Sequence, residues 1–203
     1  MARQHWLSFL PGTVARIRLM FTKPRPDRRE KRPPKPLNPA RLNDLALYYV
    51  ARFATSGAKL EDFLRRKLRE RGWEGEGDAP VRALVERFVE AGYIDDEAYA
   101  RAKSGSLLRR GYGQRRVDQA LNHAGIAEEV RDEVRAGEQE QRAAALALAK
   151  KRRFGPYSAV PPDRPLREKQ LSAMLRAGHS LAMARAVLAA ETVEAAEEWV
   201  EEG

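Results

Sequence analysis

Three glycines divide most of this chain into equal lengths. They are separated by two intervals of 53 residues and stand at Gly72, Gly125 and Gly178. Each follows an apolar residue by four positions, namely Leu68, Leu121 and Met174. Because glycine readily adopts the left-handed conformation that ends an α-helix, each glycine is expected to close a helix. A repeat at this period indicates stacked helical modules, although chance spacing of three helix-stopping glycines is the alternative.

The apolar residues around these glycines recur at helical spacing. From residue 42 onward they follow the i, i+3, i+4, i+7 template, and no segment favours a strand. The predicted fold is therefore all-α, an elongated array of three tandem three-helix repeats. We expect the repeats at 42–92, 95–138 and 139–190, with a disordered basic Pro-rich arm at 1–41 and an acidic tail at 191–203.

The net charge of +9 belongs almost entirely to the arm. Residues 1–36 hold ten Lys and Arg against two acidic residues, so the rest of the chain is nearly neutral. Prolines at 24, 26, 33, 34 and 36 exclude a helix across that part. Three interpretations stay open: a non-specific electrostatic tail, a transient amphipathic turn on an anionic surface, and a start codon assigned too far upstream. The acidic tail is expected to fray, or else to mask the arm.

The residue inventory argues against catalysis. The chain has no cysteine, which rules out disulfides, thiolate metal sites and cysteine nucleophiles. Its three histidines, at 5, 123 and 179, are too scattered to form a helix-spaced metal pair. We therefore expect no catalytic residue, no metal and no cofactor. The lack of cysteine suits a reducing cytoplasm, and no apolar run approaches the roughly 18 residues needed to span a membrane.

A basic stretch in the second repeat is the main functional signal. Between Ala98 and Val117 there are six basic residues and no acidic one. Two of them, Arg115 and Arg116, fall in the first helical turn after Gly113, where a positive charge opposes the helix dipole by roughly 0.3–1 kcal/mol. Arginine beside free N–H groups predicts an anion site, for a phosphate or a carboxylate. The alternatives are a solvated basic face, or a helix that starts elsewhere.

The candidate contact residues follow from this stretch. They are Arg101, Lys103, Arg109, Arg110, Tyr112, Arg115 and Arg116. Tyr112, between two glycines, is placed to stack on a base or to pack on a protein partner. A second basic run, Lys150 to Arg153, has a structural explanation, since cations suit the C-terminal end of a helix.

The middle of the chain resembles the RecX family, regulators of the RecA recombinase. The resemblance rests on Gly92-Tyr93-Ile94-Asp95-Asp96, Tyr99-Ala100, Arg110-Gly111-Tyr112-Gly113, Arg116, Leu121 and Gly125-Ile126. Upstream, Ala46 to Arg52 and Leu64 to Leu68 with Gly72 resemble the family's first repeat, and the similarity, which covers roughly 42–190, is weaker in the third repeat. It implies tandem three-helix repeats and a cytoplasmic modulator that binds the RecA–DNA filament and inhibits extension, ATP hydrolysis and strand exchange in recombination and the SOS response. We expect the chain to be a monomer.

Two questions stay open at this point. The basic residues could meet the phosphates of single- or double-stranded DNA, without sequence specificity, or an acidic protein surface. The alternative function is that of a general DNA-binding helical protein or transcription regulator acting through its basic patch. Against that alternative, the repeats show no single distinct recognition helix.

Overall fold

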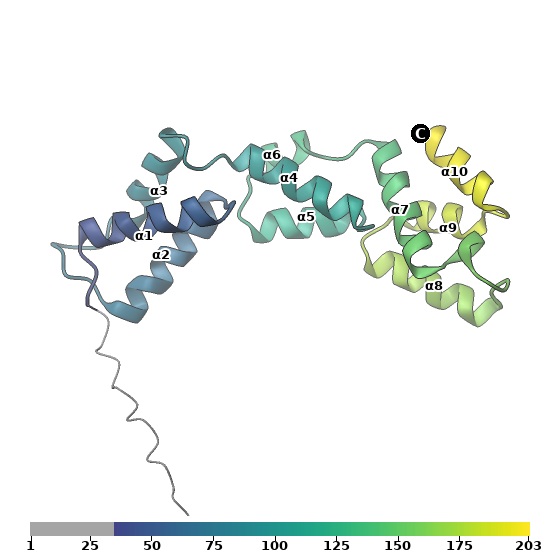
Figure 1. The fold of residues 1–203 in the computed structure, drawn as a ribbon, viewed down its shortest axis with the longest axis horizontal. Helices are drawn as coiled ribbons and strands as arrows, with labels where there is room; N and C mark the ends of the chain where they lie inside the picture. Colours follow the sequence, from purple (N-terminus) through teal and green to yellow (C-terminus); the bar gives the residue numbers. More distant parts are fainter. Residues whose placement is uncertain (1–34) are drawn as a thin grey trace, which may run out of the picture. The chain divides into compact units, whose positions relative to one another are not determined.

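A computed structural model describes residues 35–203, which fold into ten α-helices and one 3-10 helix (Figure 1). Within this range there is no β-strand, and the one isolated bridge joins Leu37 to Trp73. The all-α prediction is confirmed. None of the helices in this range is both long and apolar enough to cross a membrane.

The first group of helices encloses one apolar core. Its helices are α1 (Pro39–Arg52), α2 (Gly57–Arg71) and α3 (Val81–Glu90). Leu42, Leu60 and Leu84 are among the buried residues of this core. Side chains define where the first two helices begin: Asn38 accepts a hydrogen bond from the N–H of Arg41, and Ser56 accepts one from the N–H of Lys59. We call α1–α3 the first unit.

Two further cores follow in chain order. The second unit consists of α4 (Asp96–Arg109), α5 (Gln114–His123) and α6 (Glu128–Glu133). The third unit consists of α7 (Glu138–Arg152), the 3-10 helix η1 (Gly155–Tyr157), α8 (Arg164–Arg176), α9 (Leu181–Ala189) and α10 (Val193–Glu201). Asp95 caps α4 and Ser180 caps α9, as their positions in the sequence suggest.

The repeated glycines end the second helix of each unit, at α2, α5 and α8. All three have positive φ, of 81°, 69° and 98° in chain order. The apolar residue four positions earlier supplies the carbonyl that closes each turn. It accepts from the N–H of Gly72 at 2.8 Å in the first unit, and from the residue after the glycine in the others (Ile126 at 3.1 Å, His179 at 3.2 Å). The 53-residue spacing therefore corresponds to one structural event repeated three times.

The first unit begins earlier in the chain than the sequence suggests. Leu37 is completely buried in the first core, and its backbone N–H and C=O bond to Gly72 (3.0 Å) and Glu74 (2.7 Å). These contacts tie it to the loop after α2, and α1 begins only two residues later. Residues 35–41 thus belong to the first unit, and the rest of the expected arm lies outside the described residues.

The acidic C-terminal segment forms a helix, which corrects the expectation that it frays. Residues 193–201 form α10, in which Ala196 is fully buried. Arg142 of α7 donates a hydrogen bond to the carbonyl of Trp199 at 2.6 Å, and its guanidinium lies 5.0 Å from the centre of the indole ring. The glutamates of α10 are exposed, whereas Val193, Trp199 and Val200 are half-buried. Burial, with Glu197 and Glu194 nearby, also raises the pKa of Tyr157 beneath this helix.

Candidate nucleic-acid interface

The basic residues of α4 do not share one face. Successive residues of an α-helix are rotated by about 100°, so Arg101 and Arg109 lie on one flank of the buried stripe and Lys103 and Arg110 on the other. Arg101 is paired with Glu97 at 3.3 Å, an exposed i,i+4 contact that contributes little to stability. The guanidinium of Arg109 lies back against Gly105 of its own helix. The basic residues of this stretch therefore lie on different sides of α4 and do not form one patch.

The start of α5 is covered, which corrects part of the anion-site prediction. Gly113 does stand immediately before α5, so Arg115 and Arg116 are in its first turn. However, the N–H of Gly113 donates to the carbonyl of Ala177 at 3.0 Å, and the N–H of Arg115 donates to that of Gly178 at 3.2 Å. These amides cannot bind an anion, because the turn after α8 occupies them. The exposed side chains of the two arginines remain available.

Two glycines allow this close backbone contact between the second and third units. A Cβ added to Gly113 would lie 2.4 Å from the backbone carbon of Gly178, and one added to Gly178 would lie 2.6 Å from the amide nitrogen of Arg116. No side chain fits at either position without displacing backbone. We call this contact, where the turn 111–113 meets the turn 177–179, the junction.

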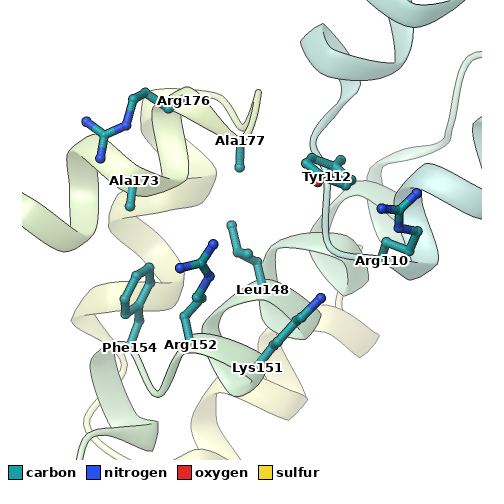
Figure 2. A pocket seen from close by; sticks show the side chains of 9 residues that line it. All are labelled: Arg110, Tyr112, Leu148, Lys151, Arg152, Phe154, Ala173, Arg176 and Ala177. Carbon is teal, nitrogen blue, oxygen red and sulfur yellow. The ribbon is translucent and has the colours of Figure 1, made fainter. Parts of the chain in front are cut away.

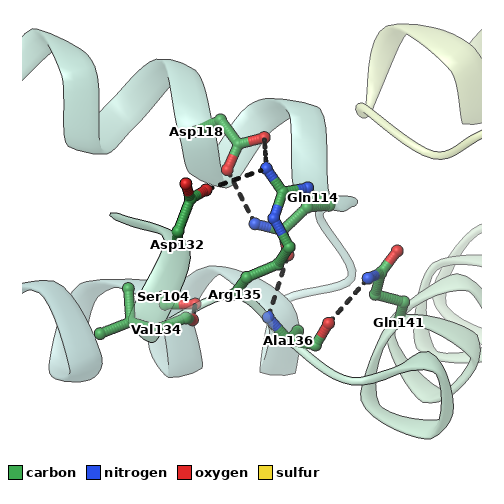
Figure 3. Close-up of polar contacts among 8 residues, drawn as sticks. All are labelled: Ser104, Gln114, Asp118, Asp132, Val134, Arg135, Ala136 and Gln141. Atoms are coloured by element: carbon green, nitrogen blue, oxygen red, sulfur yellow. Dashed lines mark hydrogen bonds and ion pairs between the residues drawn. The ribbon is translucent and has the colours of Figure 1, made fainter. Parts of the chain in front are cut away.

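A second set of polar contacts holds α5 to the segment that leads into α7 (Figure 3). Gln114 is buried; its amide donates to Asp118 at 2.8 Å and accepts from the N–H of Ala136 at 3.3 Å. Gln141 of α7 donates to the carbonyl of Ala136 at 2.8 Å. Arg135 lies 4.0 Å from Asp118. This carboxylate is thus engaged, and it forms no ion pair with either arginine of the first turn among the described residues.

Beside the junction the surface is hollowed and strongly basic. A hollow of about 280 Å³, which we call the basic hollow, is lined by Arg110, Tyr112, Leu148, Lys151, Arg152, Phe154, Ala173, Arg176 and Ala177. Figure 2 shows Arg110 and Tyr112 on the side of the second unit and Arg176 on the side of the third. The guanidinium of Arg110 lies 5.5 Å from the centre of the Tyr112 ring. Four of the nine lining residues are cations, and none of the nine, all in the described range, is acidic.

Arg176 connects the basic hollow to the start of α5. It also lines a neighbouring depression with Arg115, Gln119, Leu175 and Gly178. Arg176 thus lines one cavity with Arg110 and Tyr112 and the other with Arg115, while Arg116 packs by its backbone against Gly178. The other three predicted residues, Arg101, Lys103 and Arg109, line neither cavity. Within residues 35–203, no ion pair involves Lys103, Arg109, Arg110, Arg115, Arg116, Lys151, Arg152 or Arg176.

The sequence interpretation missed three members of this surface. Lys151 and Arg152 were visible as a basic run, and their position at the end of α7 does satisfy the helix dipole. That structural role does not prevent them from lining the basic hollow as well. Arg176 carries a weaker signal, since it stands two residues before the third repeat glycine. Its place beside Arg115 depends on two units meeting through their turns, which spacing alone does not reveal.

The sequence of the second unit matches a known domain. Residues 95–134 match the family described as RecX, second three-helix domain. Over 177 residues the chain is 35% identical to the regulatory protein RecX of Myxococcus xanthus, which covers 80% of this chain and 94% of that protein. The chain belongs to the RecX family.

Further relatives agree with this assignment. The regulatory protein RecX of Agrobacterium fabrum is 37% identical over 156 residues, covering 74% of this chain and 83% of that protein. The crystal structure of RecX from Lactobacillus salivarius aligns with a TM-score of 0.58 over 81% of this chain and 97% of that one, at 16% identity, and shares its fold. As a member of the RecX family, the chain is a non-enzymatic regulatory protein. Residues 35–203 contain no cluster of three side chains that could hold a metal ion.

Proposed function

We propose that this RecX family member binds the RecA–DNA filament in the cytoplasm, as a monomer, and inhibits its extension, ATP hydrolysis and strand exchange. The proposed contact surface contains the candidate basic residues of the second unit, extended across the junction to Lys151, Arg152 and Arg176. A surface of this charge suits a polyanion such as a DNA-containing filament.

One observation carries the proposal: the concentration of cations around the junction without a carboxylate to neutralise them. Elsewhere in the described chain, exposed arginines are commonly paired along their own helix, as Arg65 is with Glu61 and Arg82 with Glu86. Around the junction no such pair forms among the described residues, and the lining of the basic hollow contains four cations and no acidic residue. Unpaired like charges repel one another, so their retention favours a role in binding.

The proposal is tested by titrating the full chain into a DNA-stimulated RecA ATPase reaction with DNA in excess. Inhibition at protein concentrations far below those that coat the DNA supports action on the filament. Inhibition that appears only when the DNA is covered would instead indicate a general DNA-binding protein. Order-of-addition experiments then separate blocked filament extension from disassembly.

The contact surface is tested by charge reversal. The double variant Arg115→Glu, Arg116→Glu is expected to raise the half-inhibitory concentration by at least about tenfold, since two attractive contacts become repulsive. Glutamate in the first turn of α5 favours the helix dipole, so helix content is expected to stay unchanged.

The matched control is Arg164→Glu, Arg167→Glu. It makes the same change of charge in the first turn of α8, where Arg164 already pairs with Glu168 at 3.3 Å. This control is expected to inhibit like the wild type. Equal inhibition by both double variants would reject Arg115 and Arg116 as contacts.

A further inference from the structure

We infer that the basic hollow is a binding site for one nucleotide of single-stranded DNA, with the phosphate held by cations of the third unit and the base stacked on Tyr112 of the second. This inference rests on the proposed function in taking DNA as a partner. It adds a specific site, a preference for single strands, and three residues of the third unit, Lys151, Arg152 and Arg176.

Cations line the hollow from two units. Arg110 enters from the end of α4, Lys151 and Arg152 from the end of α7, and Arg176 from the end of α8 (Figure 2). Each lies in the last turn of its helix or at its C-cap, where the negative end of the helix dipole favours a cation. Four cations lining one hollow of about 280 Å³ give an attraction to phosphate that a single surface lysine lacks.

The apolar part of the lining favours a nucleotide over a bare anion. Leu148, Ala173 and Ala177 contribute apolar surface, and Tyr112 and Phe154 contribute rings. A carboxylate or free phosphate gains nothing from this surface, whereas a base gains from stacking on an aromatic face. The Tyr112 ring packs in part against the second core and has the guanidinium of Arg110 5.5 Å from its centre, so an incoming base would stack on the remaining ring surface or displace this guanidinium. This combination favours nucleic acid over an acidic protein segment.

The preference for single strands follows from the availability of the base. In a duplex both faces of a base are covered by its neighbours, so Tyr112 could stack only on a base that has left the helix. In a single strand the bases turn outward at small cost. The two walls of the hollow also belong to units that are fixed at the junction by the hydrogen bonds of Gly113 and Arg115, so little order has to be created on binding.

The charged wall is tested by fluorescence anisotropy with the full chain and a fluorescein-labelled oligo-dT of 15 nucleotides. The double variant Lys151→Gln, Arg176→Gln removes two cations from the hollow. Lys150→Gln, Arg185→Gln removes two exposed cations, from α7 and α9, that do not line it, and is the matched control. We expect at least about fivefold weaker binding for the hollow variant than for the control.

The aromatic wall is tested separately. Tyr112→Leu is expected to weaken oligo-dT binding at least about fivefold, and to leave affinity for a 15-base-pair duplex within about twofold. Tyr112→Phe keeps the ring and is expected to bind oligo-dT like the wild type. Circular dichroism of each variant verifies that helix content is retained.

Three results would overturn the inference. The first is equal oligo-dT affinity of the hollow variant and its control, and the second is an equal loss on oligo-dT and duplex for Tyr112→Leu. The third is a hollow variant that loses RecA ATPase inhibition but keeps oligo-dT affinity, which would point to an acidic protein surface instead. Because these DNA-binding measurements contain no recombinase, the site can fail while the proposed inhibition stands, and the reverse.

Discussion

The imidazole Nε2 of His179, in the third unit, lies 3.0 Å from the carbonyl oxygen of Gly111, in the second. The histidine is almost completely buried, and its Nδ1 has no hydrogen-bond partner among the described residues. Since a carbonyl can only accept, Nε2 carries a proton, and burial of the ring together with the unpartnered Nδ1 disfavours a second one. One wall of the basic hollow is therefore fixed to the other partly by a titratable side chain.

Lowering the pH should lower the free energy of unfolding through His179 at the junction. Burial lowers the pKa of His179, and the hydrogen bond to Gly111 only partly opposes this. In the unfolded chain the ring binds a proton near its usual pKa of about 6.5, whereas the folded chain resists protonation until lower pH. The unfolded state thus binds more protons in this window, so stability is complete above about pH 6.5 and falls as the pH decreases.

A comparison with His179→Gln isolates this effect, because glutamine can still donate to the Gly111 carbonyl but does not titrate. Thermal unfolding at about pH 7.5 and about pH 5.5 should show a larger loss of Tm for the wild type than for the variant. Identical losses would show that His179 does not contribute to the pH dependence.

Two glycine substitutions are expected to change stability in opposite directions, one at the junction and one inside α4. Gly113→Ala should lower the free energy of unfolding by about 1–3 kcal/mol, because its Cβ would meet the backbone of Gly178. The φ of Gly113 is −82°, so alanine is not strained there for any other reason. Gly105→Ala, inside α4, should raise stability by about 0.5–1 kcal/mol, since its Cβ meets only the mobile end of Arg109. Urea unfolding measures both, and a neutral Gly113→Ala would contradict the packing.

Ser56 is one of several residues that join the first and second units, with Gly57 and Lys59 bonded to Asp96 and Tyr99. Ser56 is fully buried; it caps α2 and donates to the carbonyl of Ala124 at 2.5 Å. Ser56→Ala should therefore cost about 2–3 kcal/mol, from the lost cap and the carbonyl left without this donor. Ser180→Ala removes only an exposed cap of α9 and should cost about 1 kcal/mol. Equal losses in urea unfolding would mean that the bond to Ala124 contributes nothing.

Local features of this fold were predictable from the sequence because they depend on few neighbouring residues. Helix ends at glycine, caps at Asp95 and Ser180, and the start of α5 after Gly113 all follow from backbone chemistry within about one turn. The same helix-end glycine occurs in each of the three repeats, which made the pattern easier to recognise. Family membership followed from the same local motifs, since they carry the resemblance.

The candidate site was only partly predictable, because it is made by contacts between distant segments. The N–H groups at the start of α5 look available in the sequence, and only the structure places the carbonyls of Ala177 and Gly178 against them. The basic hollow likewise joins Arg110 to Arg176, on different units. Helix rotation also separated residues that are close in sequence, as it did for Arg101 and Lys103.

The acidic C-terminal segment gives the final prediction. Charge alone favours an unfolded tail there, but Val193, Ala196 and Trp199 follow helical spacing on one side of α10, where Ala196 is buried and the other two are half-buried. Trp199→Ala should lower the free energy of unfolding by about 1–3 kcal/mol, because the half-buried ring packs in the third core and over the guanidinium of Arg142. Trp199→Phe should lose less, and Glu198→Ala, on the exposed side, should change stability by less than about 0.5 kcal/mol. Equal stability of Trp199→Ala and the wild type in urea unfolding would contradict the packing of α10 and favour a C-terminal segment that frays.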